Sequence, residues 1–342
     1  MKKSTFKKKV FIIAEAGVNH NGDIKLAKAL IDQAKKAGAD AVKFQTFKAD
    51  NLTSRKAPKS KYQLKSTSMK ESQQEMLKKL ELDEKAHKEL LRYCQKKKIM
   101  FLSSPFDEQS LELLVKLKVK MIKVASGEIT NFPFLEKIAL AGKTIILSTG
   151  MATLKEVKQA LNVLYKAGNE DVALLHCVTE YPAPVEEVNL KAMDTMQKAF
   201  KVPVGYSDHT LDIEIAIAAV ALGAGIIEKH LTLDKNMKGP DHKASLDPDE
   251  FANLVKSIRN VEKALGNGIK KPALCEKKNI DVVRKSLVAA DDILKNAKIK
   301  REQVVAKRPG NGIPPKDLER LLKKRARMNI KKDDVLQWGQ FL

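Results

Sequence analysis

Two histidines, His209 and His230, each follow a short apolar run, Val202–Tyr206 and Gly225–Ile227. The segment between them, Ile213–Leu222, is rich in alanine and isoleucine and is long enough for a helix. Strand, histidine, helix, strand, histidine is the order of a βαβ unit, which puts both imidazoles at the same end of two parallel strands. Two imidazoles there can hold one divalent metal and leave its other positions open to substrate. The alternative is a pair of hydrogen-bonded core histidines.

Two lysines, Lys43 and Lys123, fall inside apolar runs. An ammonium group without a partner is costly in a protein interior, so each lysine should meet an anion. The hydroxyl residues near both strands favour a phosphate or carboxylate ligand. The alternative is that each lysine pairs with a core carboxylate such as Glu15 or Glu128. Asp241 follows a Gly-Pro turn and is expected near the same ligand, although the turn alone would also explain this sequence.

The elements that must position these residues can be counted along the chain. Most of the β-like runs are almost continuously apolar, which is typical of parallel strands covered on both faces. Helical patterns lie between them. Eight such alternations predict an α/β fold of the (β/α)₈ TIM-barrel type, and a doubly wound sheet is the second choice. The runs are Val10–Val18, Ala41–Phe47, Met100–Ser104, Met121–Ala125, Thr144–Ser148, Val172–Val178, Val202–Tyr206 and Gly225–Leu233.

Helix boundaries are marked most clearly at the two ends of this region. The first helix is expected to begin at Asp23 and to end at Gly38, and the last to begin with the Asp247–Glu250 capping box. One interval is longer than the others. We expect it to hold a helix over Ser72–Lys98, preceded by a polar, lysine-rich loop, Lys48–Lys70, that covers the barrel mouth.

The regular alternation of apolar runs and helical patterns ends after residue 266. We predict a barrel domain over residues 1–266, a linker over 267–278 and a small second domain over 279–342. The turn-rich centre of that domain, 308–315, contains so much glycine and proline between structured runs that a fixed loop with Arg308 at its base is expected.

Composition limits the class of protein. The net charge is +22, but the lysines are mixed with glutamates and aromatics make up only 5%, which favours a solvated surface over a nucleic-acid site. The longest apolar run, Ile215–Ile227, is shorter than the roughly 20 residues that a membrane helix needs. Three scattered cysteines without a CxxC pair indicate a reducing compartment. We therefore expect a cytoplasmic protein that binds neither nucleic acid nor membrane.

Several motifs occur together in one order, and their combination resembles the sialic acid synthases. The likeness covers nearly the whole chain, and the tail Lys307–Gly312 resembles the antifreeze-like SAF domain of these enzymes. One such motif would be weak evidence, but nine in order are specific. They are Ile13–Gly22, Val42–Thr46, Ser104–Asp107, Ser126–Glu128, Leu147–Met151, Glu180–Pro182, Gly205–Thr210, Glu228–His230 and Gly239–His242.

The resemblance implies a TIM barrel joined to a SAF domain in a domain-swapped homodimer. It also implies condensation of phosphoenolpyruvate with an N-acetylated amino sugar, with Mn²⁺ or Mg²⁺ required. By this likeness His209 and His230 hold the metal. The residues implied to bind phosphoenolpyruvate are Lys43, Ser104, Lys123, Ser126, Ser148 and Ser207. Those implied to contact the sugar are Glu15, Gln45, Glu128, Tyr181 and Asp241. Arg308 of the partner subunit is implied to close over the acyl group of the sugar. Thr179 stands where some relatives carry a substrate-contacting Asn, and it is the one departure from the family pattern among the substrate-binding residues.

The chemistry of the residues agrees with this resemblance. Lys43 and Lys123 suit the phosphate and carboxylate charges, and either Glu15 or Asp241 is expected to move the proton. The resemblance implies N-acetylmannosamine as the acceptor, and the alternative is the 2,4-diacetamido-2,4,6-trideoxymannose that gives legionaminic acid. A different metal-dependent barrel aldolase or lyase is a remoter possibility. Ser126-Gly127-Glu128 fits both synthase groups better than the pseudaminic acid enzymes.

Overall fold

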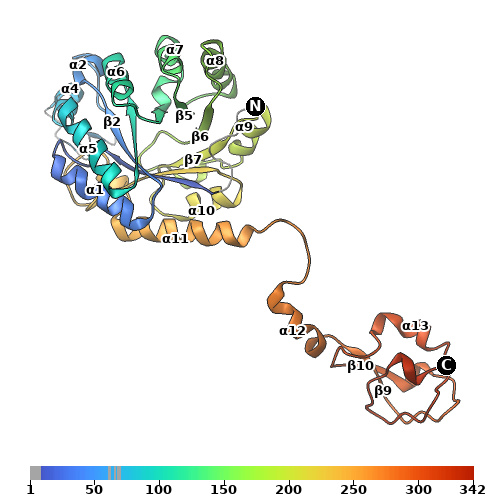
Figure 1. Cartoon of the computed structure of the whole chain (residues 1–342). Helices are drawn as coiled ribbons and strands as arrows, with labels where there is room; N and C mark the ends of the chain where they lie inside the picture. The colour runs from blue at the N-terminus through green and yellow to red at the C-terminus, as the bar shows by residue number, and fades with distance from the viewer. Residues whose placement is uncertain (1–8, 61–62, 65–66, 68–70) are drawn as a thin grey trace. The chain divides into compact units, whose positions relative to one another are not determined.

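The computed structural model describes residues 9–60, 63–64, 67 and 71–342, which form two compact units, residues 1–266 and 267–342. In the described part of the first unit, eight strands form one sheet with helices outside them (Figure 1). The strands are β1 (Phe11–Gly17), β2 (Ala41–Thr46), β3 (Met100–Pro105), β4 (Met121–Val124), β5 (Thr144–Ser148), β6 (Val172–His176), β7 (Val204–Asp208) and β8 (Ile226–His230).

The strand order shows how the sheet closes. It runs β3-β2-β1-β8-β7-β6-β5-β4, and the paired strands are parallel. The first strand of the chain therefore pairs with the last, since Ile13 lies opposite Glu228. β3 and β4, at the two ends of the order, also contact each other. The predicted TIM barrel is confirmed, and a doubly wound open sheet is excluded.

In the described residues, one helix of at least 8 residues follows each strand of the barrel. The caps predicted for the first and last of these helices are present. Asp23 accepts a hydrogen bond from the Lys25 amide, and Gly38 ends the same helix in the left-handed region at φ 89°. Asp247 and Glu250 form the predicted capping box. The helices are α1 (Ile24–Ala37), α5 (Glu84–Lys97), α6 (Glu108–Lys116), α7 (Phe132–Leu140), α8 (Leu154–Lys166), α9 (Ala192–Phe200), α10 (Glu214–Ala221) and α11 (Pro248–Leu265).

The single helix predicted over Ser72–Lys98 is wrong. The segment forms two helices, α4 (Gln73–Lys78) and α5, because Asp83 caps a new helix by accepting from the Ala86 amide. The preceding loop, predicted over Lys48–Lys70, begins with a short helix, α2 (Ala49–Leu52), that packs against α4. Residues 61–62, 65–66 and 68–70 of that loop lie outside the described residues.

The barrel interior has an apolar layer and, further along the strands, a polar one. Because side chains alternate along a strand, every second residue faces inward. The apolar layer is a buried cluster of Ile13, Ala41, Leu102, Met121, Ile146, Ala173, Leu175 and Ile226. Two residues further along the strands, the inward side chains are Glu15, Lys43, Ser104, Lys123, Ser148, Cys177 and Glu228. The fold therefore gathers polar residues at the carboxyl ends of the strands.

The second unit has its own core of buried apolar residues, which includes Leu287, Ile299 and Leu336. Its described elements are α12 (Leu274–Val283), the antiparallel pair β9 (Ser286–Ala289) and β10 (Val304–Lys307), and α13 (Leu318–Leu321). α12 begins inside the stretch expected to be a linker. Across the described parts of both units, no helix combines the length and apolar character that crossing a membrane requires.

Candidate active site

Two lysines and one glutamate form the centre of the polar layer. The Glu228 carboxylate lies 3.3 Å from the Lys123 ammonium and 3.5 Å from the Lys43 ammonium, and all three side chains are buried. Burial opposes the charge on Glu228, but Lys123 and Lys43 outweigh it and lower the carboxyl pKa to about 2. Burial also opposes the charge on Lys43, yet Glu15 and Glu228 raise its pKa, whereas burial prevails at Lys123 and lowers its pKa. The lysines share a permanent counter-ion.

Glu15 is the second carboxylate of this layer. It lies 3.1 Å from the Lys43 ammonium and accepts a hydrogen bond of 3.4 Å from the Gln45 amide. Burial raises its pKa to about 7, with Glu228 adding to the effect and Lys43 opposing it. A carboxyl with such a pKa exchanges its proton near neutral pH. When Glu15 is protonated, the two lysines carry more charge than Glu228 balances, which suits an anionic ligand.

The two histidines come from adjacent strands. Asp208 lies opposite Lys229 in the β7–β8 register, so His209 and His230 are the next residues on both strands. Their ring centroids are 5.7 Å apart, and the Tyr181 ring lies 4.2 Å from that of His209. Burial lowers the pKa of His209 to about 4 and that of His230 well below its usual value, so both rings are neutral at physiological pH. Neutral imidazoles are the form that binds metals.

The hydrogen bonds of His209 determine which ring nitrogen has a free lone pair. Nδ1 lies 2.6 Å from the Val178 carbonyl oxygen and must donate to it. Nε2 therefore carries a lone pair, and it faces the Ser207 hydroxyl at 3.3 Å. That hydroxyl donates its hydrogen to Glu228 at 2.9 Å. The lone pair of His209 is thus left for a Lewis acid.

The donor set fits a metal held by two imidazoles. Within the described ranges, no group of three or more His, Cys, Asp and Glu side chains is arranged to hold a metal. His230 Nδ1 is buried and has no hydrogen-bond partner among the described residues. A nitrogen from each ring can reach one ion across this separation, and substrate or water must supply the other ligands.

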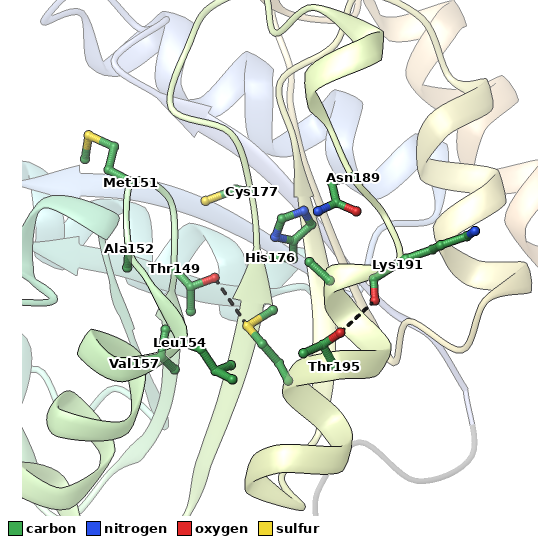
Figure 2. A pocket seen from close by; sticks show the side chains of 12 residues that line it. Thr149, Met151, Ala152, Leu154, Val157, His176, Cys177, Asn189, Lys191 and Thr195 are labelled. Atoms are coloured by element: carbon green, nitrogen blue, oxygen red, sulfur yellow. Dashed lines mark hydrogen bonds between the residues drawn. The ribbon is translucent and has the colours of Figure 1, made fainter.

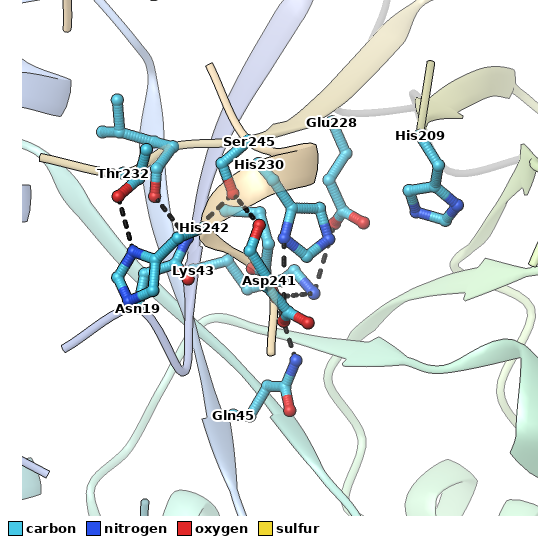
Figure 3. A network of polar contacts seen from close by, with 12 residues as sticks. Asn19, Lys43, Gln45, His209, Glu228, His230, Thr232, Asp241, His242 and Ser245 are labelled. Atoms are coloured by element: carbon cyan, nitrogen blue, oxygen red, sulfur yellow. Dashed lines mark hydrogen bonds and ion pairs between the residues drawn. The ribbon is translucent and has the colours of Figure 1, made fainter. Parts of the chain in front are cut away.

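Asp241, the alternative to Glu15 for proton transfer, lies beside His230. Its carboxylate is 3.9 Å from His230 Nδ1, which is too long for a hydrogen bond. Burial raises its pKa to about 6. The Ser245 hydroxyl donates to the Asp241 carbonyl at 2.7 Å and accepts from the Asn19 amide at 2.9 Å. Figure 3 shows this network beside Lys43, Glu228 and the two imidazoles.

The other predicted residues in the barrel lie at or just beyond the carboxyl ends of the strands. Lys43 donates to the Ser104 hydroxyl at 3.3 Å, and Glu128, whose pKa burial raises, accepts from Asn131 at 2.8 Å. The Ser126 hydroxyl accepts from the Gly150 amide at 3.0 Å. Two further hydroxyls, Ser148 Oγ and Thr179 Oγ1, are buried without a hydrogen-bond partner in the described part of the chain. Unpartnered buried polar atoms at the strand ends call for an explanation, and a bound ligand would supply their partners.

Arg308 is the predicted residue that lies outside the barrel. It belongs to the second unit, where its Nε donates to the Val283 carbonyl at 3.0 Å and its side chain is exposed. Because Arg308 belongs to the second unit, its expected contact with the sugar stays a prediction.

Two further residues of the site were not predicted from the sequence. Glu228 enters the sequence analysis only as the first residue of the Glu228–His230 motif, although it contacts both lysines. Cys177 lies with its Sγ 3.2 Å from Ser126 Oγ. It also borders a cavity of about 410 Å³ between the segments that follow β5 and β6, with Met151 and His176 in its wall (Figure 2). Lys43 and Lys123 do not line this cavity, so we assign the chemistry to the polar layer.

Comparison with known proteins agrees with this geometry. The model of the NeuB family matches residues 30–270, and that of the SAF domain matches residues 284–342. The chain belongs to the NeuB family. An N,N'-diacetyllegionaminic acid synthase of Campylobacter jejuni is 58% identical over 332 residues, which are 96% of this chain and 99% of that protein. The Legionella pneumophila enzyme of the same name is 48% identical over 96% of this chain and 93% of its own length.

A solved structure gives the same result for this NeuB-family chain. An N-acetylneuraminic acid (sialic acid) synthetase from Leptospira borgpetersenii is 37% identical, with a TM-score of 0.71, and the match covers 80% of this chain and 90% of that one. The resemblance to the sialic acid synthases is therefore confirmed. The chain is a nonulosonic acid synthase of the phosphoenolpyruvate-dependent, sialic type.

Proposed function

We propose that this synthase condenses phosphoenolpyruvate with 2,4-diacetamido-2,4,6-trideoxymannose to give N,N'-diacetyllegionaminic acid and phosphate. The observation that carries this choice is the 58% identity to the Campylobacter jejuni enzyme over almost the full length of both chains. N-acetylmannosamine, the acceptor expected first from the sequence motifs, becomes the alternative. The human relative, an N-acetylneuraminate-9-phosphate synthase, is 39% identical.

The roles that we propose follow the geometry of the polar layer. Lys43 and Lys123 hold the phosphate and carboxylate of phosphoenolpyruvate, since both ammonium groups are buried and face the same space. Ser104, Ser126, Ser148 and Ser207 supply hydroxyls to the same anion. These groups are fixed before the substrate arrives and stabilise charge without rearranging.

His209 and His230 are proposed to hold a divalent metal, Mn²⁺ or Mg²⁺. When bound, the metal supplies Lewis-acid polarisation of the sugar aldehyde. The two rings contribute neutral nitrogen ligands, and Tyr181 packs on both of them, with ring centroids 4.2 Å and 5.6 Å away. This packing limits the rotation of the rings.

Proton transfer is assigned to Glu15 or Asp241. The methylene carbon of phosphoenolpyruvate attacks the aldehyde, water adds to the adjacent carbon, and phosphate leaves. The aldehyde oxygen gains a proton and the attacking water loses one. Glu15 and Asp241, with pKa values of about 7 and about 6, can each accept or release a proton under these conditions. We assign Gln45, Glu128 and Thr179 as further sugar contacts.

We also propose a domain-swapped homodimer in the cytoplasm, in which Arg308 of the partner subunit reaches the sugar. Exposed apolar side chains on α12, Leu274 and Val282, support burial of this helix in an assembly. The scattered spacing of the three cysteines, without a CxxC pair, supports a reducing compartment. Light scattering of the purified chain measures the assembly directly, and a monomer would contradict it.

The test of the acceptor is a side-by-side assay of both sugars with phosphoenolpyruvate and Mn²⁺. Phosphate release is followed at several concentrations of each sugar. The proposal expects a higher kcat/KM for the diacetamido sugar. A higher value for N-acetylmannosamine would make the alternative correct, and phosphate release without any sugar would contradict a synthase.

A further inference from the structure

A buried ion pair lies directly behind the two histidines. Asp208 is the last residue of β7 and directly precedes His209, and Lys229 precedes His230 on β8. Because side chains alternate, Asp208 and Lys229 point to the outer face of the barrel wall when the histidines point inward. Their charged groups are 2.8 Å apart, and both side chains are 0% exposed. The pair is separate from the inner cluster of Glu15, Lys43, Lys123 and Glu228.

The polar contacts of this pair tie the segment around His209 to β8. Lys229 donates to the Thr210 carbonyl at 2.6 Å and to the Asp212 carbonyl at 2.9 Å, in addition to Asp208. The other oxygen of Asp208 accepts from the Thr210 amide at 2.9 Å and from the Thr210 hydroxyl at 2.8 Å. His209 is therefore the middle residue of a turn in which the Asp208 carboxylate, at one end, binds the amide and hydroxyl of Thr210, at the other.

The ion pair lies at the point where the pairing of β7 with β8 ends. The paired part of β7 and β8 ends with Asp208 opposite Lys229. His209 and His230 lie one residue beyond it, where strand pairing no longer fixes the distance between the two backbones. The ion pair connects the two strands at this position, because Lys229 of β8 binds the Asp208 carboxylate of β7.

Stability alone is a weak explanation for such a pair. Desolvation of two charges costs about as much as their attraction returns, and well-packed apolar residues are often equally stable. A network with all its hydrogen bonds made does, however, fix one arrangement of the groups it joins. We therefore attribute to this ion pair a role in fixing the positions of the backbone segments that it joins.

We propose that Asp208 and Lys229 are positioning residues that set the distance between the imidazoles of His209 and His230 and thereby the affinity for the divalent metal. This inference rests on the two-histidine metal site proposed above. Neither residue touches substrate or metal. Each acts through the backbone of the histidine that follows it.

The experiment measures Mn²⁺ binding by the full chain, from the electron paramagnetic resonance signal of free Mn²⁺. Lys229→Met removes the ammonium, and Asp208→Asn removes the charge but keeps an acceptor for Thr210. Arg259→Met is the matched control, because Arg259 pairs with Asp40 at 2.7 Å beside the amino end of β2. Circular dichroism at the same temperature selects conditions in which each variant is folded.

The Mn²⁺ dissociation constant is expected to rise by about 10- to 100-fold in both pair variants and to stay unchanged in the control. Binding of phosphoenolpyruvate without metal, measured by calorimetry, should not change, because the lysines are untouched. If Lys229→Met does not fold, the Mn²⁺ dissociation constant of Asp208→Asn tests the proposal by itself. Folded pair variants that bind Mn²⁺ as tightly as the unmodified chain would overturn the positioning role and leave the metal site intact. Equal binding by His230→Ala and the unmodified chain would overturn both.

Discussion

Glu228 on β8 and Lys123 on β4 form an ion pair of 3.3 Å across the barrel interior. The two strands are far apart in the sheet order, so the contact spans the barrel and does not follow the wall. Lys43 approaches the same carboxylate from β2. Without substrate, Glu228 is thus the anion around which the lysines are arranged, and substrate anions join a site whose positive charges are already in place.

Glu228→Gln should destabilise the protein and alter its response to substrate. Two buried ammonium groups lose their counter-ion, which costs about 3 kcal/mol of unfolding free energy. Phosphoenolpyruvate should then raise the melting temperature of the variant more than that of the unmodified chain, because the substrate supplies the missing negative charge. Thermal melts with and without phosphoenolpyruvate test this, and equal shifts in both proteins would contradict it.

His230→Ala should abolish turnover while the barrel remains folded. The side chain makes no hydrogen bond through Nδ1 within the described chain, so its removal leaves no partner of that atom unsatisfied. Phosphate release with both substrates and Mn²⁺ measures the activity, and circular dichroism measures the fold. His20→Asn is a useful companion, since it removes a buried imidazole that is not assigned to the metal. Substantial activity in His230→Ala after treatment with EDTA would remove this residue from the metal site.

Gly150→Ala should damage the site by crowding. A Cβ at this position would lie 2.2 Å from Thr179 Oγ1, 2.9 Å from Ser126 Oγ and 3.0 Å from Cys177 Sγ. Relief of such overlap costs about 1–3 kcal/mol and displaces hydroxyls that we assign to the substrates. The control is Gly127→Ala, because a Cβ there has no atom of the described residues within 4 Å. Steady-state kinetics of both variants test this, and equal kcat/KM values would contradict the crowding argument.

Arg308→Ala should raise the KM for the sugar with little change in the KM for phosphoenolpyruvate. Arg308 is exposed in its own unit and makes one hydrogen bond to the Val283 carbonyl there, so stability should change little. Trp338 is the only tryptophan of the chain, and its fluorescence reports on the same unit. Lys307→Ala, one residue away, serves as the control. A normal sugar KM in Arg308→Ala would remove this residue from the active site.

Mild acid should destabilise the barrel through His20. Burial lowers the pKa of His20 to about 4 from an ordinary value of 6.5. As the pH falls below 6.5, the unfolded chain takes up this proton first, so the contribution to stability is complete above 6.5 and is lost as the pH approaches 4. The loss is on the order of 3 kcal/mol, at about 1.4 kcal/mol for each pKa unit.

His20→Asn provides the comparison for this pH dependence. The Asn side chain can keep an acceptor near the position of Nδ1, which receives the Gly22 amide at 3.0 Å, but it does not titrate. Urea unfolding at several pH values should show a shallower decline for the variant. Parallel curves for the two proteins would show that His20 does not contribute.

Much of the fold could be predicted because local patterns determine it. Continuous apolar runs marked all eight strands, and Asp23, Gly38 and Asp247 marked helix ends through their own backbone hydrogen bonds. The division of Ser72–Lys98 was missed because apolar residues, including Leu80 and Leu82, continue through the break. The capping carboxylate of Asp83 was the available signal.

The site could be predicted in part. Lys43 and Lys123 stood out because a charge inside an apolar run needs a partner. Glu228 was harder to find, because its importance depends on which strands face each other across the barrel, and no single strand carries that information. The positions of Asp208 and Lys229 likewise depend on the β7–β8 register.

The pairing of β1 with β8 also constrains when the barrel can form during synthesis. Phe11 to Glu15 pair with Ile226 to His230, so the first strand lacks one neighbour until almost the whole barrel has left the ribosome. Contacts between such distant segments are slow to form. A nascent chain that stops before β8 leaves apolar strand surface open to other chains, and chaperones are expected to protect it.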